Sequence, residues 1–286
     1  MDLKTTEQEN WSLVIRPQRS WWDLRLGEIF QYLELIQLLV WRDFVAAYKQ
    51  TILGPFWYVI QQLVSTGVYT IIFGEIAQLP TDGMPPALFY MAGTTIWGYF
   101  SGCLQGTSNT FTGNARIFGK VYFPRLVMPI ATVVSNLISF GLRFLVFLLV
   151  YLFFAIQGAT YAPNWWILSL PLILLTMAGL GLGIGIIISS MTIKYRDLQQ
   201  IVGHGILLLM YATPVLYPLS MVPEQWEWVF LANPLTPMIE IFRYSFMGAS
   251  VINPLSILYS IGFTFVVLVV GILIFNRAES TFMDTV

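Results

Sequence analysis

Long apolar runs constrain this chain more than any other feature. A helix that crosses a bilayer needs about 20 mostly apolar residues, and six stretches meet or approach that length. They are residues 53–76, 87–108, 129–156, 165–191, 200–217 and 254–276. The fifth is the weakest, because it is short and holds His204 and Pro214. The runs are continuous, unlike the alternating strands of about ten residues in a membrane β-barrel. The sequence therefore predicts an all-α integral membrane protein with six transmembrane helices.

The composition excludes several other classes. Of the 286 residues, 57% are apolar and 10% are charged, whereas about 25% of an average soluble domain is charged. A formal net charge of −1 provides no basic surface for nucleic acid. The single cysteine, Cys103, and the single histidine, His204, exclude a disulfide scaffold and disfavour a Cys/His metal site. We therefore expect no nucleic-acid partner and no bound metal.

The basic residues predict the orientation in the membrane, because cytoplasmic loops carry an excess of Lys and Arg. Of the 14 Lys and Arg residues, twelve lie before the first run, in the loops after the second and fourth runs, or in the tail. The opposite loops hold only Arg243, and Arg143 lies inside the third run. This distribution predicts that both termini are cytoplasmic.

The chain divides into an arm at 1–52, a membrane domain at 53–276 and a cytoplasmic tail at 277–286. The arm is charged throughout and shows no signal-peptide pattern. Apolar residues of the arm recur at spacings of three and four, at Trp22, Leu26, Ile29, Leu33 and Ile36. This spacing predicts an amphipathic helix that lies in the cytoplasmic membrane interface. Packing on a soluble partner is the alternative.

Residues 225–250 form a possible seventh span, but Pro234, Pro237, Glu240 and Arg243 interrupt it. Non-helical backbone at membrane depth is tolerated only where protein or a water-filled cavity covers it. We therefore expect a re-entrant or interfacial pair of short helices on the outer face, within 218–253. Glu240 and Arg243 are three residues apart, which predicts a local ion pair.

The runs show no catalytic pattern, since no pair of carboxylates and no His–carboxylate set lies within them. Residues 113–120 (GNARIFGK) are similar to a phosphate-binding loop, but five residues separate the glycines and Val121 follows the lysine. Alternate glycines at 179–185 form overlapping GxxxG patterns within a run, which favours close helix packing over a nucleotide site. We therefore expect a chain without catalytic residues or a nucleotide site of its own.

Three segments resemble a known family: RDFVAAYKQTILGPFW at 42–57, IFGKVYFPRLVMPI at 117–130 and NPLTPMIEIFRY at 233–244. With six runs and cytoplasmic termini, they resemble the membrane subunit of an ABC-2 type exporter of the polysaccharide/polyol-phosphate branch. Bacterial O-antigen, capsule and teichoic acid exporters belong to that branch. The resemblance implies an inner-membrane permease that moves a lipid-linked polysaccharide from the cytoplasm to the periplasm. The first candidate for this polysaccharide is O-antigen, which is exported in lipopolysaccharide biosynthesis. It further implies a channel at a homodimer interface, two copies of a separate ABC ATPase that binds the ATP, and no cofactor on this chain.

The resemblance also implies roles for two segments. A coupling helix within 109–125 is expected to dock into the ATPase, with contacts from Arg116, Phe118, Lys120 and Phe123. Anchoring of this loop by its positive charges is the alternative. The outer segment resembles the family's periplasmic gate, with Asn233, Pro234, Glu240 and Arg243.

A glycan path needs aromatic faces and polar groups that do not hold the chain too tightly. The first run supplies Trp57 together with a roughly shared face of Tyr58, Gln61, Gln62 and Tyr69. A buried glutamine is costly unless it is paired, so a water-lined path or a dimer interface suits these residues. Secondary candidates are Trp97, Tyr99, Phe100, Tyr211 and Tyr217. Interfacial belts of Tyr and Trp are the alternative.

Three cations are candidate contacts for a lipid headgroup. Arg42 and Lys49 lie at the predicted cytoplasmic mouth, where phosphate recognition favours Arg and Lys. Arg143 lies near the centre of a long run, so its side chain must face protein or water. Two roles for Arg143 are therefore open: binding of a lipid diphosphate, or a hydrogen bond to a partner inside the protein.

Other functions fit parts of the pattern. Within the same family, a capsule or teichoic acid exporter and a small-lipid or drug exporter are the alternatives. A membrane glycan-lipid transferase would need a carboxylate cluster that the runs lack, and a small-solute channel or carrier would show flux without an ATPase.

Overall fold

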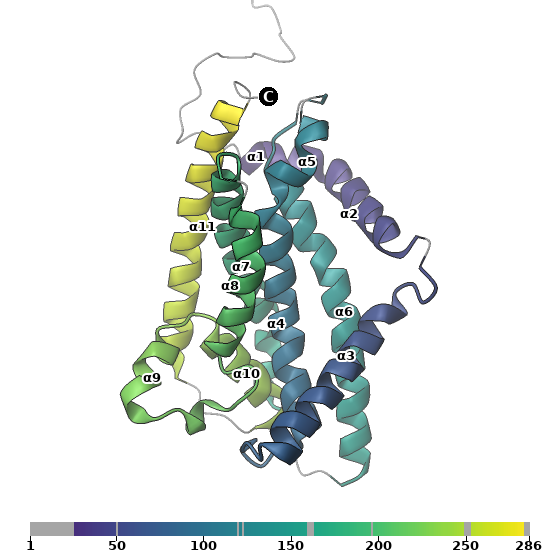
Figure 1. Ribbon diagram of the computed structural model, residues 1–286, viewed down its shortest axis with the longest axis vertical. Helices are drawn as coiled ribbons and strands as arrows, with labels where there is room; N and C mark the ends of the chain where they lie inside the picture. Colours follow the sequence, from purple (N-terminus) through teal and green to yellow (C-terminus); the bar gives the residue numbers. More distant parts are fainter. Residues whose placement is uncertain are drawn as a thin grey trace, which may run out of the picture.

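The computed structural model describes residues 26–49, 51–118, 120–121, 123–158, 163–195, 197–248 and 253–282. All regular secondary structure in these ranges is helical (Figure 1). The prediction of an all-α protein is thereby confirmed. Trp22 and the basic residues Lys4, Arg16, Arg19, Arg25 and Arg196 lie outside the described residues.

The helices that run lengthwise in Figure 1 reproduce the predicted runs closely. They are α3 (Phe56–Tyr69), continued by the π-helical segment η2 (Thr70–Ile76), then α4 (Pro86–Ser108), α6 (Val127–Ile156), the short η3 (Trp165–Ser169) with α7 (Leu170–Thr192), α8 (Leu198–Tyr211) and α11 (Pro254–Phe282). The expected span at 200–217 is wrong at its end, because α8 stops at Tyr211. Pro214 lies shortly beyond this end, and a proline ring sterically disfavours the helical conformation of the residue before it.

Four helical stretches in the described part of the chain are long and apolar enough to cross a membrane. They are Phe56–Ile76, Val127–Ile156, Trp165–Thr192 and Pro254–Ala278. Helix α4 has 23 residues but carries many Gly, Thr and Ser residues, and α8 has 14 residues. The structure thus supports a helical membrane protein, while the count of six spans stays a prediction.

Helix α7 packs against α4 on one side and α11 on the other, and its glycines make this possible. A methyl group at Gly181 would lie 2.7 Å from Cβ of Cys103 and 3.1 Å from the backbone of Leu104. On the other side, a methyl group at Gly271 of α11 would lie 2.7 Å from the carbonyl oxygen of Gly183. Glycines therefore let three backbones approach closely, as the GxxxG patterns predict.

The arm is helical further along the chain than predicted. Helix α1 (Leu26–Ile29) and η1 (Phe30–Tyr32) lead into α2 (Leu33–Tyr48), which continues well beyond Ile36. Ile36 and Leu39 are buried in a cluster with residues of α5 and α6, but Leu33 is 56% exposed. The predicted apolar face is therefore divided between this cluster and the surface of the chain. Phe30, Leu38 and Trp41 are also exposed, which suits an apolar face that lies in a membrane interface.

The two ends of the molecule carry different elements (Figure 1). The short helix α5 (Thr110–Phe118) lies at the same end as α1 and the final turns of α11. The opposite end holds η4 (Leu219–Met221), α9 (Glu224–Leu231) and α10 (Thr236–Met247). The predicted pair of short helices within 218–253 is therefore present, and α10 is almost entirely buried.

Candidate functional site

The predicted polar and aromatic face of α3 is divided by the structure. Gln62 is 6% exposed, and its Nε2 donates to the hydroxyl oxygens of Thr94 at 3.0 Å and Thr95 at 3.3 Å. Gln62 therefore joins α3 to α4, and its hydrogen bonds are satisfied within the chain. The adjacent Gln61 is exposed, so two neighbouring glutamines serve different surroundings.

The aromatic path candidates divide in the same way. Trp97, Tyr99 and Phe100 of α4 are buried in the main apolar core. Tyr69 is half-buried beside Phe73. Of the ten predicted path residues, Trp57, Gln61 and Tyr211 are exposed on this single chain, while Tyr217 donates its hydroxyl to the carbonyl of Tyr211. The buried members cannot face a glycan without a rearrangement of the core.

The three predicted headgroup cations have different surroundings. Arg42 is paired with Asp43, with 2.7 Å between Nη2 and Oδ1. Lys49 is exposed directly after the end of α2. Arg143 lies within α6, and its guanidinium carbon is 5.2 Å from the ring centre of Tyr58. Within the described residues Arg143 has no side-chain hydrogen bond, so a cation–π contact takes the place of the expected internal partner.

Arg143 occupies a notch that sequence reasoning missed. A Cβ atom at Gly98 of α4 would collide with the Arg143 guanidinium, and one at Gly102 would collide with the amide of Asn136. Gly106 continues the series and faces the methyl group of Thr132. The GxxxGxxxG spacing of 98–106 could have indicated a packing face. Only the tertiary structure shows that polar side chains of α6 fill the spaces beside these three glycines of α4.

The predicted coupling segment contains helix α5 and presents two kinds of side chain. Arg116 and Lys120 are exposed. Phe118 and Phe123 are 5% and 6% exposed, and their rings lie 5.8 Å apart in a buried cluster. Direct contact of these two phenylalanines with a docked protein is therefore not supported. They anchor the segment, while the two cations face outward.

Helix α5 is also tied to the membrane helices behind it. The rings of Phe111 and Phe275 of α11 stack with centroids 4.6 Å apart. The backbone N–H of Phe111 donates to Oγ of Ser189 on α7 at 3.0 Å, and the Gln199 amide of α8 donates to the hydroxyl of Thr112. Helix α5 is therefore in direct contact with α7, α8 and α11.

At the opposite end, Arg243 of α10 is 1% exposed. Its Nη1 lies 3.2 Å from Oε1 of Glu240, so the predicted ion pair is formed. Nη1 also donates to the carbonyl of Pro214 at 2.8 Å, and Nη2 to that of Val215 at 2.6 Å. The guanidinium carbon lies 3.7 Å from the ring centre of Phe89. Arg243 thus holds α10, the turn after α8 and α4 together.

Asn233 closes the junction between α9 and α10. Its Nδ2 donates to Oγ1 of Thr213 at 2.8 Å, and its Oδ1 accepts from the N–H of Leu235 at 3.0 Å. Pro234 is half-buried beside it. The predicted outer-gate residues therefore form one unit around the turn after α8, in which the buried Nε of Arg243 has no hydrogen-bond partner among the described residues.

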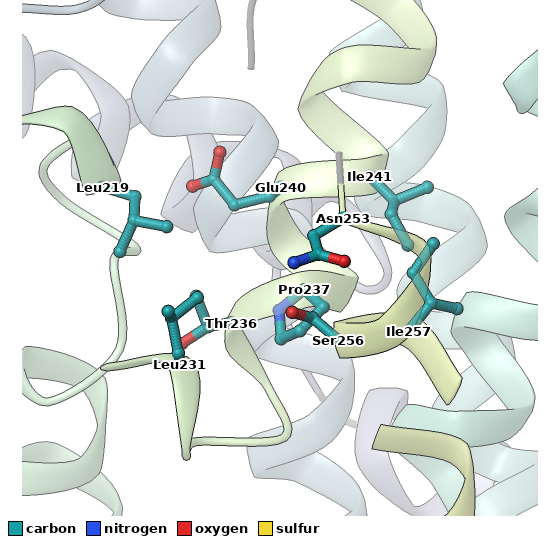
Figure 2. A pocket seen from close by; sticks show the side chains of 9 residues that line it. All are labelled: Leu219, Leu231, Thr236, Pro237, Glu240, Ile241, Asn253, Ser256 and Ile257. Carbon is teal, nitrogen blue, oxygen red and sulfur yellow. The ribbon is translucent and has the colours of Figure 1, made fainter. Parts of the chain in front are cut away.

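Figure 2 shows side chains that line a small cavity between this unit and the start of α11. The cavity has a volume of about 30 Å³. Glu240 and Thr236 contribute from α10, and Asn253 and Ser256 from the chain entering α11. A space of this size suits a single water molecule. In the described part of the chain, no three His, Cys, Asp or Glu side chains gather into a group that could hold a metal ion.

Known proteins resemble this chain along most of its length. The family model described as ABC-2 type transporter matches residues 34–247. The chain is 31% identical over 261 residues to the O-antigen export system permease protein RfbA of Klebsiella pneumoniae, covering 91% of this chain and 96% of that protein. It is 29% identical over 200 residues to RfbA of Myxococcus xanthus, covering 69% and 74%.

A more distant relative is the polysialic acid transport protein KpsM of Escherichia coli, 22% identical over 254 residues, which cover 87% of this chain and 95% of that protein. The family match spans both the coupling segment and the outer unit described above. The chain therefore belongs to the ABC-2 type transporter family and is the permease subunit of an ABC exporter.

Proposed function

We propose that this permease moves a lipid-linked polysaccharide, O-antigen in the first place, from the cytoplasm to the periplasm of a bacterial cell. In this proposal it acts as a homodimer in the inner membrane with two copies of a separate ABC ATPase. Residues 1–52 form the interfacial arm, 53–276 the six-span membrane domain and 277–286 the tail. Both termini are cytoplasmic.

The observation that carries the proposal is the match to permeases named for O-antigen export. At 31% identity it covers 91% of this chain and nearly the whole relative, so it includes arm, spans and outer segment together. The weaker match to KpsM at 22% identity favours a second cargo, a capsular polysaccharide, within the same class.

The packing supports a route between two copies of the chain. The α4 aromatic residues that could contact sugar rings are buried inside one chain, whereas Trp57, Gln61 and Tyr211 are exposed on α3 and at the end of α8. A polysaccharide path lined by the exposed residues needs a second protein surface opposite them. A homodimer supplies that surface with the smallest number of components.

The two ends of the molecule support the orientation. Arg116 and Lys120 are exposed at the end that carries α5 and the last turns of α11. Positive charge at that end agrees with a cytoplasmic location and with docking of an ATPase subunit there. ATP would then be bound by the partner, and a movement of α5 would reach the long helices through the Phe111–Phe275 contact.

The experiment that tests the proposal is purification of the tagged chain in mild detergent, followed by mass spectrometry of the proteins and lipids that come with it. We expect an ABC ATPase in a one-to-one ratio and a prenyl-diphosphate glycan. The double variant Arg116→Ala/Lys120→Ala should lose most of the ATPase. Lys194→Ala, which removes another exposed cation beside the α7–α8 turn, is the matched control and should retain it.

The same variants can be scored in cells. Deleting the gene should remove polymerised glycan from the cell surface and leave lipid-linked glycan inside, and the wild-type chain should restore export. A chain that purifies alone and modifies a lipid-linked sugar without ATP would contradict the proposal, as would solute flux in the absence of any ATPase.

A further inference from the structure

A cavity of about 200 Å³ lies between the arm helix α2 and the membrane helices α3 and α6. It is smaller than the pockets of about 300–1,000 Å³ that take drug-sized ligands. It has the volume of roughly six or seven water molecules in the liquid, at about 30 Å³ each. The space therefore suits one compact ring or headgroup rather than an extended chain.

One wall of this cavity is a polar stripe on α6. Thr132, Ser135, Asn136 and Ser139 line it at spacings of three and four, which places them on one face of the helix. Oγ of Ser135 is buried and has no hydrogen-bond partner among the described residues. Such a hydroxyl is costly to bury unpaired, and a change of the Ser135 χ1 rotamer would turn it toward the cavity that this residue lines, where a ligand hydroxyl would satisfy it.

The facing wall is aromatic. Tyr48 of α2 and Tyr58 of α3 both line the cavity, with ring centroids 6.0 Å apart at an interplanar angle of 74°. Burial and the neighbouring Tyr58 raise the pKa of Tyr48 to about 12. Its phenol is therefore neutral at physiological pH and can both donate and accept a hydrogen bond.

The charges argue against a phosphate as the occupant. Asp43 is the charged residue in the lining, with its carboxylate also paired to Arg42. Arg143 lies one turn beyond Ser139 on α6, against Gly98 and the Tyr58 ring, and does not line the cavity. Among the described residues, the lining therefore contains no cation that could hold a phosphate, whereas the Asp43 carboxylate accepts hydrogen bonds from hydroxyl groups. Hydroxyls, an amide, a carboxylate and aromatic faces together suit an uncharged polyol.

We propose that this cavity binds a single sugar ring carried on a membrane lipid anchor. The position of the cavity favours an anchored ligand, because one wall is α2. Leu38 and Trp41 of α2, with Phe30 of η1, expose an apolar face suited to the membrane interface. Binding of a glycolipid headgroup in this cavity does not depend on the proposed function. The further statement that this sugar is the anchor-proximal residue of the exported glycan rests on the proposed function.

The test uses the full chain with its ATPase partner in nanodiscs of phosphatidylcholine. The probe is monoglucosyl diacylglycerol, compared with diacylglycerol and phosphatidylglycerol of the same acyl chains, and native mass spectrometry measures the bound lipid. We expect the glucosyl lipid to bind at least about tenfold more tightly than diacylglycerol, the gain expected from two or more hydrogen bonds. It should also displace phosphatidylglycerol.

The variant Ser135→Ala/Ser139→Ala should remove about tenfold of that preference, because it deletes two cavity hydroxyls. Tyr58→Phe, which retains the ring, should weaken binding less and guards against a folding defect in the double variant. Ser190→Ala is the matched control, since its hydroxyl bonds to the carbonyl of Ile186 on α7. It should bind the glucosyl lipid as the wild type does.

Equal binding of glucosyl lipid and diacylglycerol would overturn the proposal. Unchanged preference in the double serine variant would overturn it as well, since the sugar would then bind elsewhere. Tighter binding of phosphatidylglycerol would assign the cavity to a membrane phospholipid and reject the sugar. Serine-dependent sugar binding in a complex that exports no glycan would uphold the site and contradict the proposed function instead.

Discussion

Helices α7 and α3 are both apolar enough to span a membrane, yet they are packed in opposite ways. In the stretch Trp165–Thr192, 50% of the most apolar window is buried inside the chain, compared with 11% in Phe56–Ile76. Helix α7 carries glycines where α4 and α11 approach. The stretch formed by α3 and η2 carries large side chains such as Leu63, Val64 and Ile71, which are exposed.

This difference teaches that apolar sequence alone serves two purposes in this molecule. Around α7 the small residues permit backbone contact, and such contact supplies dispersion energy without needing water to be expelled. Along α3 the large apolar side chains face outward, where lipid or a second copy of the chain must cover them. The α4–α7–α11 layer is therefore expected to be the rigid part, and helices α2 and α3 the more easily displaced part.

The largest effect is expected where the rigid layer is tied to the outer unit. Arg243→Met should lower the free energy of unfolding by about 3–5 kcal/mol, because it removes the buried ion pair with Glu240 and the donors to the carbonyls of Pro214 and Val215. The apparent unfolding temperature in detergent, followed by size-exclusion fluorescence, measures this. Arg243→Met/Glu240→Gln should recover part of the loss. Wild-type stability of the single variant would show that the ion pair does not hold α10.

A smaller loss is expected within the rigid layer itself. Gly181→Ala should cost about 1–3 kcal/mol, the range for overpacking, because the added methyl meets Cys103 and the backbone of α4. Gly203→Ala on α8 meets nothing within 4 Å and should gain slightly from helix propensity. The same unfolding assay compares the two. Equal stability of both variants would remove the distinction between the layers.

The connection between α3 and the rigid α4–α7–α11 layer can be weakened at one residue. Gln62→Leu should cost about 0.6–2 kcal/mol, the range for hydrogen bonds between membrane helices, since it removes the bonds to Thr94 and Thr95. The adjacent, exposed Gln61→Leu is the control and should change stability by less than about 0.5 kcal/mol. If Gln61→Leu proved the more harmful, Gln61 rather than Gln62 would be the residue that needs a partner.

The smallest effect is expected at the α4–α6 contact. Gly98→Ala should cost less than about 1 kcal/mol, below the usual range for overpacking, because the added methyl meets the end of the flexible Arg143 side chain rather than backbone. Thermal unfolding beside Gly181→Ala gives the comparison. A loss as large as that of Gly181→Ala would show that α6 belongs to the rigid layer.

The predicted site residues could be placed on helices but not among their neighbours. Gln62 and Gln61 are adjacent in the sequence and equally polar, yet one is paired with α4 and the other is exposed. Phe118 and Phe123 are large aromatic residues of the kind that docking surfaces often contain, but they are buried in one cluster with Phe111 and Phe275. Helical periodicity states which residues share a face, and it contains no information on which neighbour that face meets.

The sequence by itself determined the helical class, the bounds of most long helices, the short outer helices and the Glu240–Arg243 ion pair. Each of these depends on residues close together in the chain, whose apolar runs, prolines and spacings act locally. Only the tertiary structure decided that the carbonyls of Pro214 and Val215 accept hydrogen bonds from Arg243, that Gly98 accommodates Arg143, and that α2, α3 and α6 enclose a polar cavity. Those features require segments far apart in sequence to meet, and their contacts are set by the shape and polarity of both partners at once.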